Sequence, residues 1–195
     1  MRMIQRLSSV ALAVAAMGFV HTASAQTDAP NRAGGTVAAI AGLGIGTQTG
    51  SGAGFSIGVE GGYTLPMHLY IGGNFTYNVG KINSWLFEPQ VGYDLALFGD
   101  LPIMIRPFVG LGYQSYSVAS AACSGLSGAE ESACVAEANS LGVGSVTGFV
   151  ISPGAVGTYA LTPHIYVGGE VRFDIGTETG TPVLINILGT GGYRF

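Results

Sequence analysis

The sequence is poor in charged residues and lacks long apolar runs beyond its N-terminal region. Charged residues make up 9 % of the chain, whereas 48 % are hydrophobic and 33 are glycine. No later segment reaches the roughly 18 consecutive apolar residues that a transmembrane helix requires, so we expect none. An apolar composition without apolar runs is typical of strands whose two faces differ, as in a membrane barrel.

Basic residues are also scarce. Lysine and arginine total 7 against 11 acidic residues, which gives a formal net charge of −4. Removal of Arg2 and Arg6 with a leader would make that charge more negative still. An acidic chain with so few basic side chains argues against nucleic acid as a partner.

The N-terminal region has the three parts of a secretory leader. Arg2 and Arg6 supply the positive charge, residues 7–20 are mostly apolar but too short to span a bilayer, and residues 23–25 read Ala-Ser-Ala. We predict a signal peptide over 1–25, cleaved before Gln26; an uncleaved anchor is the alternative. No cysteine lies near this site, so a lipoprotein is not expected.

The C-terminal residues 181–195 alternate strictly between two faces. One face reads Val183, Ile185, Ile187, Gly189, Gly191, Tyr193 and Phe195. A strand at the end of a sheet needs a partner, and pairing with the first strand would close a barrel. The final Phe195, with Tyr193 two residues earlier, resembles the C-terminal signal of bacterial outer-membrane β-barrels. The resemblance implies recognition by the barrel-assembly machinery; Gly189 and Gly191 depart from its usual apolar pattern.

The rest of the chain repeats this alternation after a short periplasmic lead over 26–34. We predict an all-β fold, an eight-stranded antiparallel up-and-down transmembrane barrel over 35–195, with strands at 35–47, 53–65, 69–79, 85–97, 103–116, 145–160, 165–176 and 181–195. Short turns alternate with variable loops, and the long extracellular loop covers 117–144. Pro89, Pro107 and Pro153 fall inside strands, where each calls for a bulge or a strand end.

The aromatic residues indicate which face is outside. With both termini in the periplasm, one group lies near the extracellular ends of the strands and another near the periplasmic ends. The first is Phe55, Phe75, Tyr77, Trp85, Phe87, Tyr113 and Phe173; the second is Tyr63, Tyr93, Tyr159, Tyr193 and Phe195. Two belts on the apolar face match the two interfaces of a membrane. A soluble, lipocalin-like barrel with its apolar face inward is the alternative.

The polar face then lines the interior, which eight strands leave only wide enough for side chains. It carries glycines and charged residues. The glycines are Gly58, Gly62, Gly72, Gly92, Gly110, Gly112 and Gly168, and the charges are Glu60, Glu88, Asp94, Arg106, Glu170, Arg172, Asp174 and Arg194. Buried charges need partners. A hydrogen-bonded plug is favoured over an ion path or proton relay. In a regular hairpin Asp94 would lie opposite Arg106.

The long loop holds both cysteines of the chain, Cys123 and Cys134. In an oxidising envelope this pattern predicts a disulfide. Two free thiols are the alternative, and a metal site would need more ligands than the loop offers. The loop glutamates Glu130, Glu131 and Glu137, and Glu178 in the last loop, are typical of a solvated surface.

These residues resemble the OmpA/OmpX-like group of small outer-membrane barrels, without a peptidoglycan-binding domain. The resemblance implies a structural or surface-interaction protein, not a wide-bore porin, with outer-membrane lipid and lipopolysaccharide around it and an unidentified extracellular partner. A narrow OmpW-like transport protein is the alternative, disfavoured by the inward charges. An outer-leaflet lipid-modifying enzyme is less favoured, because His68 and His164 fall in periplasmic turns and give a serine no base. We expect no enzymatic activity and no cofactor.

Overall fold

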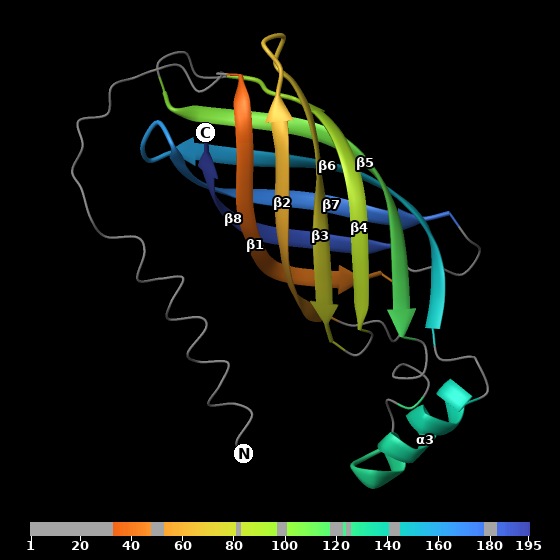
Figure 1. The fold of residues 1–195 in the computed structure, drawn as a ribbon. Helices are drawn as coiled ribbons and strands as arrows, with labels where there is room; N and C mark the ends of the chain where they lie inside the picture. Colours follow the sequence, from red (N-terminus) through yellow and green to blue (C-terminus); the bar gives the residue numbers. More distant parts are fainter. Residues whose placement is uncertain are drawn as a thin grey trace.

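The computed structural model describes residues 33–47, 53–80, 83–96, 101–117, 123, 126–140, 145–177 and 183–195. Its strands form a closed barrel in chain order (Figure 1). The elements are β1 (Gly34–Gly46), β2 (Ala53–Thr64), β3 (Leu69–Val79), β4 (Ser84–Tyr93), β5 (Ile103–Ser117), α3 (Ala129–Ser140), β6 (Ser145–Ala160), β7 (Ile165–Gly176) and β8 (Leu184–Arg194). Among the described helices, none is long and apolar enough to cross a membrane. The leader predicted over 1–25 lies outside these residues.

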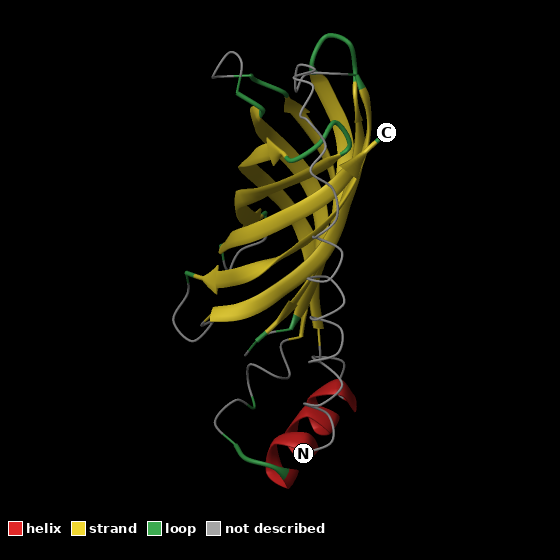
Figure 2. Cartoon of the chain, turned by 90° about the vertical axis from the view of Figure 1, so that its left-hand side faces the viewer, coloured by secondary structure: helices red, strands yellow, loops and turns green. Residues whose placement is uncertain are grey.

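The eight-stranded antiparallel barrel is the fold predicted from the alternation. Every ladder between neighbouring strands is antiparallel, and β8 pairs with β1 to close the wall. Figure 2 shows the strands of this wall, with the helix beyond one end of the barrel. The predicted bounds differ from the observed ones by more than one residue at two strands: β4 ends at Tyr93 rather than at residue 97, and β8 begins at Leu184 rather than at residue 181. Residues 145–160, the least regular of the predicted strands, form β6 without interruption.

The two ends of the barrel differ. We call the end that holds the turns after β2 and β6 the turn end; there the backbone N–H groups of Leu65 and Leu161 donate to the carbonyls of Leu69 and Ile165. Phe195 and Gly35 exchange two backbone hydrogen bonds of 3.0 Å at this end. The opposite end, where α3 lies between β5 and β6, is the loop end (Figure 1).

The strands are staggered around the wall, so a path of paired residues does not return to its start. Beginning at Gly34 and following each partner to the next strand, the path ends on the same strand at Gly44. It runs Gly34, Thr64, Tyr70, Gly92, Phe108, Gly154, Arg172, Asn186 and Gly44. This stagger brings side chains from distant strands to one level inside the barrel.

The three prolines produce neither bulges nor strand ends, which corrects the expectation from sequence. Pro89 pairs with Gly73 of β3, but the β4–β5 ladder passes from Phe87–Tyr113 directly to Gln90–Gly110. The β6–β7 ladder likewise has no pair at Pro153, and the β4–β5 ladder has none at Pro107. The register is the same on both sides of each gap. Each proline therefore costs a ladder bond on one side only.

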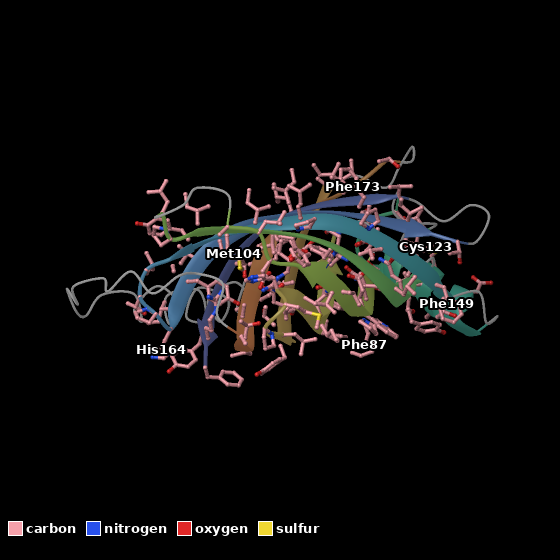
Figure 3. All side chains as sticks on the ribbon, turned by 90° about the horizontal axis from the view of Figure 1, so that it is seen from above. Phe87, Met104, Cys123, Phe149, His164 and Phe173 are labelled. Atoms are coloured by element: carbon pink, nitrogen blue, oxygen red, sulfur yellow. A yellow bond between two sulfur atoms is a disulfide. The ribbon has the colours of Figure 1, made fainter. Side chains whose placement is uncertain are left out.

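The apolar face of the wall points outward. Phe55, Phe75, Phe87 and Phe173 are between 42 % and 55 % exposed, and the other aromatic residues of both predicted belts are also exposed except for half-buried Trp85. In Figure 3, Phe87, Phe149 and Phe173 lie along the outside of the barrel. This arrangement is the reverse of a soluble barrel and leaves a surface suited to lipid.

One aromatic row crosses four strands near the loop end. The ring centroids are 6.5 Å apart for Phe75 and Trp85, 5.8 Å for Trp85 and Tyr113, and 5.9 Å for Tyr113 and Phe149. Phe149 on β6 is 68 % exposed and was not among the predicted belt residues. The row makes β3 to β6 the more aromatic side of this end.

Candidate functional site

The predicted interior charges do lie inside the barrel. Seven of these side chains are buried, and Arg194 is half-buried near the turn end. The buried ones are Glu60, Glu88, Asp94, Arg106, Glu170, Arg172 and Asp174. They separate into a group at the turn end and a larger network at the loop end.

The turn-end cluster centres on the ion pair between Arg106 and Asp94. Arg106 Nε lies 2.5 Å from Asp94 Oδ1, and Arg106 Nη2 donates to Asp94 Oδ2 at 3.1 Å. Thr64 Oγ1 donates to the same Oδ2 at 2.8 Å. The hairpin has the register expected from sequence, because the flanking residues Leu95 and Ile105 are bridged. Asp94 thus has a bidentate guanidinium and a hydroxyl as partners.

Large side chains fill the rest of the turn end by lying over glycines. The guanidinium of Arg106 stacks 3.6 Å from the centroid of the Tyr70 ring. A Cβ added at Gly62 would lie 2.5 Å from Tyr70 Cζ, and one added at Gly192 would lie 2.5 Å from Tyr166 Cζ. A Cβ added at Gly154 would likewise lie 2.5 Å from Phe108 Cζ. The glycines therefore make room for rings that point inward.

A continuous hydrogen-bonded network occupies the loop end. Tyr116 Oη donates to Gln114 at 2.6 Å, and Gln114 Nε2 reaches Ser84 Oγ at 3.4 Å. Asn78 Nδ2 donates to the same Ser84 hydroxyl at 3.0 Å, and Asn78 Oδ1 accepts from Ser56 Oγ at 2.5 Å. This loop-end network therefore spans β2, β3, β4 and β5.

The network continues across the lumen to Arg172, which is fully buried on β7. Asn186 Oδ1 lies 3.2 Å from Ser56 Oγ, and Asn186 Nδ2 donates to Asp174 at 2.6 Å. Arg172 Nε lies 2.9 Å from Asp174 Oδ1, and Arg172 Nη1 donates to Glu170 at 3.2 Å. Its Nη2 donates to Thr76 on the opposite side at 3.1 Å. One guanidinium on β7 thus reaches across the lumen to β3.

Glu88 ends the network nearest the middle of the barrel. Thr76 Oγ1 donates to Asn74 at 3.2 Å, and Asn74 Nδ2 and Gln90 Nε2 donate to Glu88 Oε1 at 3.2 and 2.8 Å. The buried hydroxyl of Ser152 on β6 is a third donor to the Glu88 carboxyl group. Glu88 is thereby held by neutral donors from β3, β4 and β6, as expected for a buried polar group.

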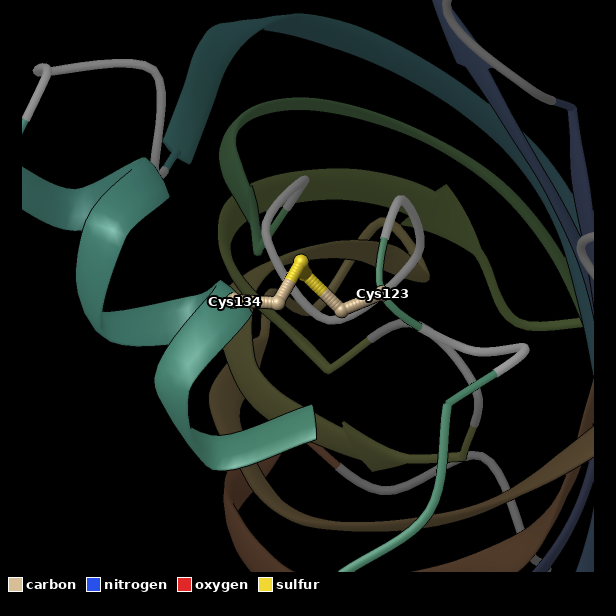
Figure 4. The surroundings of a disulfide bond; sticks show 2 residues. All are labelled: Cys123 and Cys134. Carbon is tan, nitrogen blue, oxygen red and sulfur yellow. A yellow bond between two sulfur atoms is a disulfide. The ribbon is translucent and has the colours of Figure 1, made fainter. Parts of the chain in front are cut away.

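Cys123 and Cys134 form a disulfide at the loop end, with Cα atoms 6.0 Å apart (Figure 4). Cys134 belongs to α3, and Cys123 is fully buried beneath it. Glu130 and Glu131 lie in the first turn of α3 and are exposed. The bond ties the helix to the segment that follows β5. The sequence did not predict this helix within the loop.

The histidines lie apart from this network. His164 is exposed at the turn end, with Nδ1 3.0 Å from the carbonyl oxygen of Arg194 and its ring stacked on Tyr193 at 5.5 Å. His68 follows β2, and its ring contacts the edge of Tyr93 at 6.1 Å. Within the described part of the chain, no group of His, Cys, Asp or Glu side chains is arranged to hold a metal ion.

Sequence reasoning missed several interior residues. Phe108, Tyr116 and Tyr166 are buried inside, as is Tyr70, which the alternation places on the inward face. Their even positions in the alternation were the available signal. Thr76, Asn186 and Ser152 also lie at even positions. Their contacts could not be predicted, because the partners come from strands far away in the sequence.

Comparisons with known proteins agree on the fold. No family model matches the chain, and no curated protein matches it. Neisserial surface protein A matches with TM-score 0.61 at 15 % identity, covering 83 % of this chain and 97 % of that chain. The N-terminal β-barrel domain of Pseudomonas aeruginosa OprF matches with TM-score 0.57 at 13 % identity, covering 84 % and 100 %.

Ail, the attachment invasion locus protein of Yersinia pestis, matches with TM-score 0.52 at 11 % identity, covering 84 % and 100 %. At these identities the likeness concerns the fold alone. The chain has the closed, eight-stranded antiparallel barrel fold that these outer-membrane barrels share.

Proposed function

We propose that this protein is a non-conducting outer-membrane barrel that presents a disulfide-tied helical loop at the cell surface. The loop end then faces outward and the turn end faces the periplasm. The observation that carries the proposal is the filled interior, since Arg172, Leu86 and Gln114 are fully buried within the barrel. A barrel without a bore leaves its loops as the part able to meet a partner.

The loop end offers one ordered candidate for that contact. Helix α3 extends beyond the strands (Figure 1), and its exposed acidic first turn is held by the Cys123–Cys134 bond. A tethered helix loses less conformational entropy on binding than a free loop, which favours recognition. The name of Neisserial surface protein A contains the word "surface", and that of Ail, the attachment invasion locus protein, contains "attachment". These names support a surface role here.

The membrane-facing residues are suited to contact with outer-membrane lipid, lipopolysaccharide and the barrel-assembly machinery. The aromatic row from Phe75 to Phe149 would lie at the outer interface, in contact with lipopolysaccharide, and Tyr93 and Tyr159 at the inner one. Phe195 is 72 % exposed beside Tyr193, so the C-terminal pair is accessible to the assembly machinery before membrane insertion. A cleaved leader over 1–25 would deliver the chain to the envelope.

Binding of whole cells to host or bacterial surface components tests the surface role. Cells that display the wild-type protein should bind such a component. Cells that display either double variant, Glu130→Gln/Glu131→Gln or Cys123→Ser/Cys134→Ser, should bind it less well. Ser132→Ala, on the same helix, is the matched control for surface display. Equal binding by all variants and by cells lacking the protein would contradict the proposal.

Conductance in planar bilayers tests the filled barrel. The purified protein should give no stable open channel, because side chains occupy the lumen. Large, long-lived conductance steps would instead favour the narrow transport alternative. The buried charges at Arg172 and Asp174 already disfavour an apolar pathway of the OmpW type.

An enzymatic role has little support. His68 and His164 lie at the turn end, whereas acyl chains of the outer leaflet would surround the loop end. No hydroxyl hydrogen bond to either histidine ring is found within the described residues. Assays of lipid A from cells with and without the protein should therefore give identical products.

A further inference from the structure

The outward aromatic residues of the turn end lie on strands of one direction only. β2, β4, β6 and β8 run toward that end, and each carries a tyrosine there that is between 46 % and 51 % exposed. These residues are Tyr63, Tyr93, Tyr159 and Tyr193. β1, β3, β5 and β7 begin at the turn end, and their outward positions there hold glycine or aliphatic residues. Those positions are Gly35, Val37, Leu69, Ile71, Ile103, Ile105, Ile165 and Val167.

Each of these tyrosines faces an aliphatic residue on a neighbouring strand. Leu69 on β3 is paired with Tyr93 on β4, and Ile165 on β7 is paired with Tyr193 on β8. The other two pairs are Ile71 with Tyr63 and Ile103 with Tyr159. Both residues of such a pair lie at the same depth in the wall. A membrane interface therefore gives no reason for the tyrosine to fall every time on the strand that runs toward the turn end.

The aromatic belt at the loop end has no such preference. Phe75 and Phe173 lie on β3 and β7, which run toward the loop end, whereas Phe55 and Phe87 lie on β2 and β4, which run away from it. Both directions thus supply aromatic residues where a side chain has only to meet the interface. The preference at the turn end calls for a cause that depends on the direction of the chain.

A short motif surrounds the four tyrosines of the turn end. Two residues after each tyrosine comes a large apolar residue, so that every copy reads Tyr-x-Leu or Tyr-x-Phe; we call this the strand-end motif. The four apolar residues are Leu65, Leu95, Leu161 and Phe195. The copy in β8 is the pair Tyr193 and Phe195, which resembles the C-terminal signal of outer-membrane barrels.

The copy at the end of β4 has the same local structure as the copy at the end of β8. The backbone N–H of Asp94 donates to the carbonyl of His68 at 2.8 Å, and that of Arg194 donates to the carbonyl of His164 at 2.7 Å. The ring centroids of His68 and Tyr93 are 6.1 Å apart, and those of His164 and Tyr193 are 5.5 Å apart. A partner that binds the end of β8 would find the same features at the end of β4.

A strand with an open edge can bind a partner in a way that depends on its direction. Each strand that carries the motif is the second strand of a hairpin, and its outer edge stays open until the next strand is added. An open edge joins a partner's sheet through main-chain hydrogen bonds, while pockets for alternate side chains provide specificity. The tyrosine and the residue two positions later project from the same face, as such pockets require.

We propose that the strand-end motifs of β2, β4 and β6 are recognition sites for the barrel-assembly machinery. The machinery binds the open edge of each hairpin in turn, before it binds β8, and releases that edge when the next hairpin pairs with it. In the finished barrel the same tyrosines remain at the membrane interface. This inference rests on the role proposed above for Tyr193 and Phe195.

Exchanging the two residues of a facing pair separates recognition from the membrane belt. Tyr93→Leu/Leu69→Tyr moves the ring to the neighbouring strand at the same depth, and Tyr193→Ile/Ile165→Tyr does the same at β8. Folding of the urea-denatured chain is timed in lipid vesicles with and without the purified assembly machinery. Both exchanges should lower the ratio of the assisted to the unassisted folding rate by a similar factor. Phe173→Ile, in the belt of the loop end, is the control and should leave this ratio unchanged.

The outcomes separate this inference from the role of the C-terminal pair. A ratio that falls for the β8 exchange alone would overturn the inference and leave the C-terminal role standing. A ratio that neither exchange changes would contradict both. An equal fall for Phe173→Ile would also overturn the inference, since any outward aromatic residue would then serve. Tyr93→Leu alone gives the same test should Leu69→Tyr block unassisted folding, and Tyr93→Phe should keep the ratio of the wild type.

Discussion

The two halves of the barrel interior are filled in different ways. At the turn end a few large side chains, Tyr70, Arg106, Phe108 and Tyr166, lie over glycines. At the loop end many small amides and hydroxyls bond to one another around Arg172. The first half depends on shape and on the Arg106–Asp94 ion pair, and the second on a network of hydrogen bonds. The turn end should therefore be sensitive to added volume and to loss of that pair, and the loop end to loss of a hydrogen-bond partner.

The largest loss is expected from breaking the ion pair between Arg106 and Asp94 at the turn end. Asp94→Ala or Arg106→Ala should each lower the free energy of unfolding by about 3–5 kcal/mol, because the remaining charge stays buried. The double variant should recover much of that loss. Urea unfolding in lipid vesicles measures the cycle, and strictly additive losses would show that the two side chains act independently.

A pair of adjacent glycines tests the dependence on shape. Gly192→Ala puts a methyl group against Tyr166 and the backbone carbonyl of Val37, and should cost roughly 1–3 kcal/mol. Gly191→Ala, the next residue along β8, meets open space on the outside and serves as the control. Equal stability of the two variants would mean that Tyr166 does not occupy the space above Gly192.

Loss of one amide tests the dependence on hydrogen bonds. Asn186→Ala removes the contacts to Ser56 and Asp174 and leaves a buried carboxylate oxygen without its donor, at a cost of about 1–3 kcal/mol. Thr147→Ala, on the exposed face of β6, should change little. A stable Asn186→Ala protein would indicate that the loop end does not need this connection.

The disulfide should matter least to the barrel. Cys123→Ser/Cys134→Ser should leave the urea midpoint of the strands unchanged, because the bond joins only α3 to the preceding segment. Within the loop, the disulfide should stabilise the folded conformation by about 2–3 kcal/mol, because it lowers the entropy of the unfolded loop. Limited proteolysis should therefore cut the loop of the double variant faster than that of the wild type, and a shifted barrel midpoint would contradict this separation.

The alternation of side chains made most of the wall predictable. It indicated the face of each residue, and the expectation of a regular hairpin gave the Asp94–Arg106 register. Local pattern could not reveal contacts across the lumen, such as the one between Ser56 and Asn186, because these depend on the stagger of the whole barrel. The inward rings of Phe108 and Tyr166 were missed for another reason, since the composition of the outer belts suggested that aromatic residues face lipid.

The prolines show where a correct local rule led to a wrong result. Proline does remove a ladder bond, but at Pro89 and Pro153 the pairs on both sides keep their register. The continuous ladders on the other side of each strand, to β3 and to β5, hold the residues in line. A bulge would have turned every following side chain to the wrong face, at a far greater cost than one bond.

The closing seam between β1 and β8 also affects how fast the barrel can form. Every other seam joins strands that are consecutive in the chain, whereas this one joins Thr36 to Arg194 and Gly46 to Leu184. Contacts between residues so distant in sequence carry the largest loop-closure entropy and are slow to form. Hairpins can assemble one after another, but the cylinder exists only once this seam is made. We therefore expect formation of this seam to limit the rate of folding.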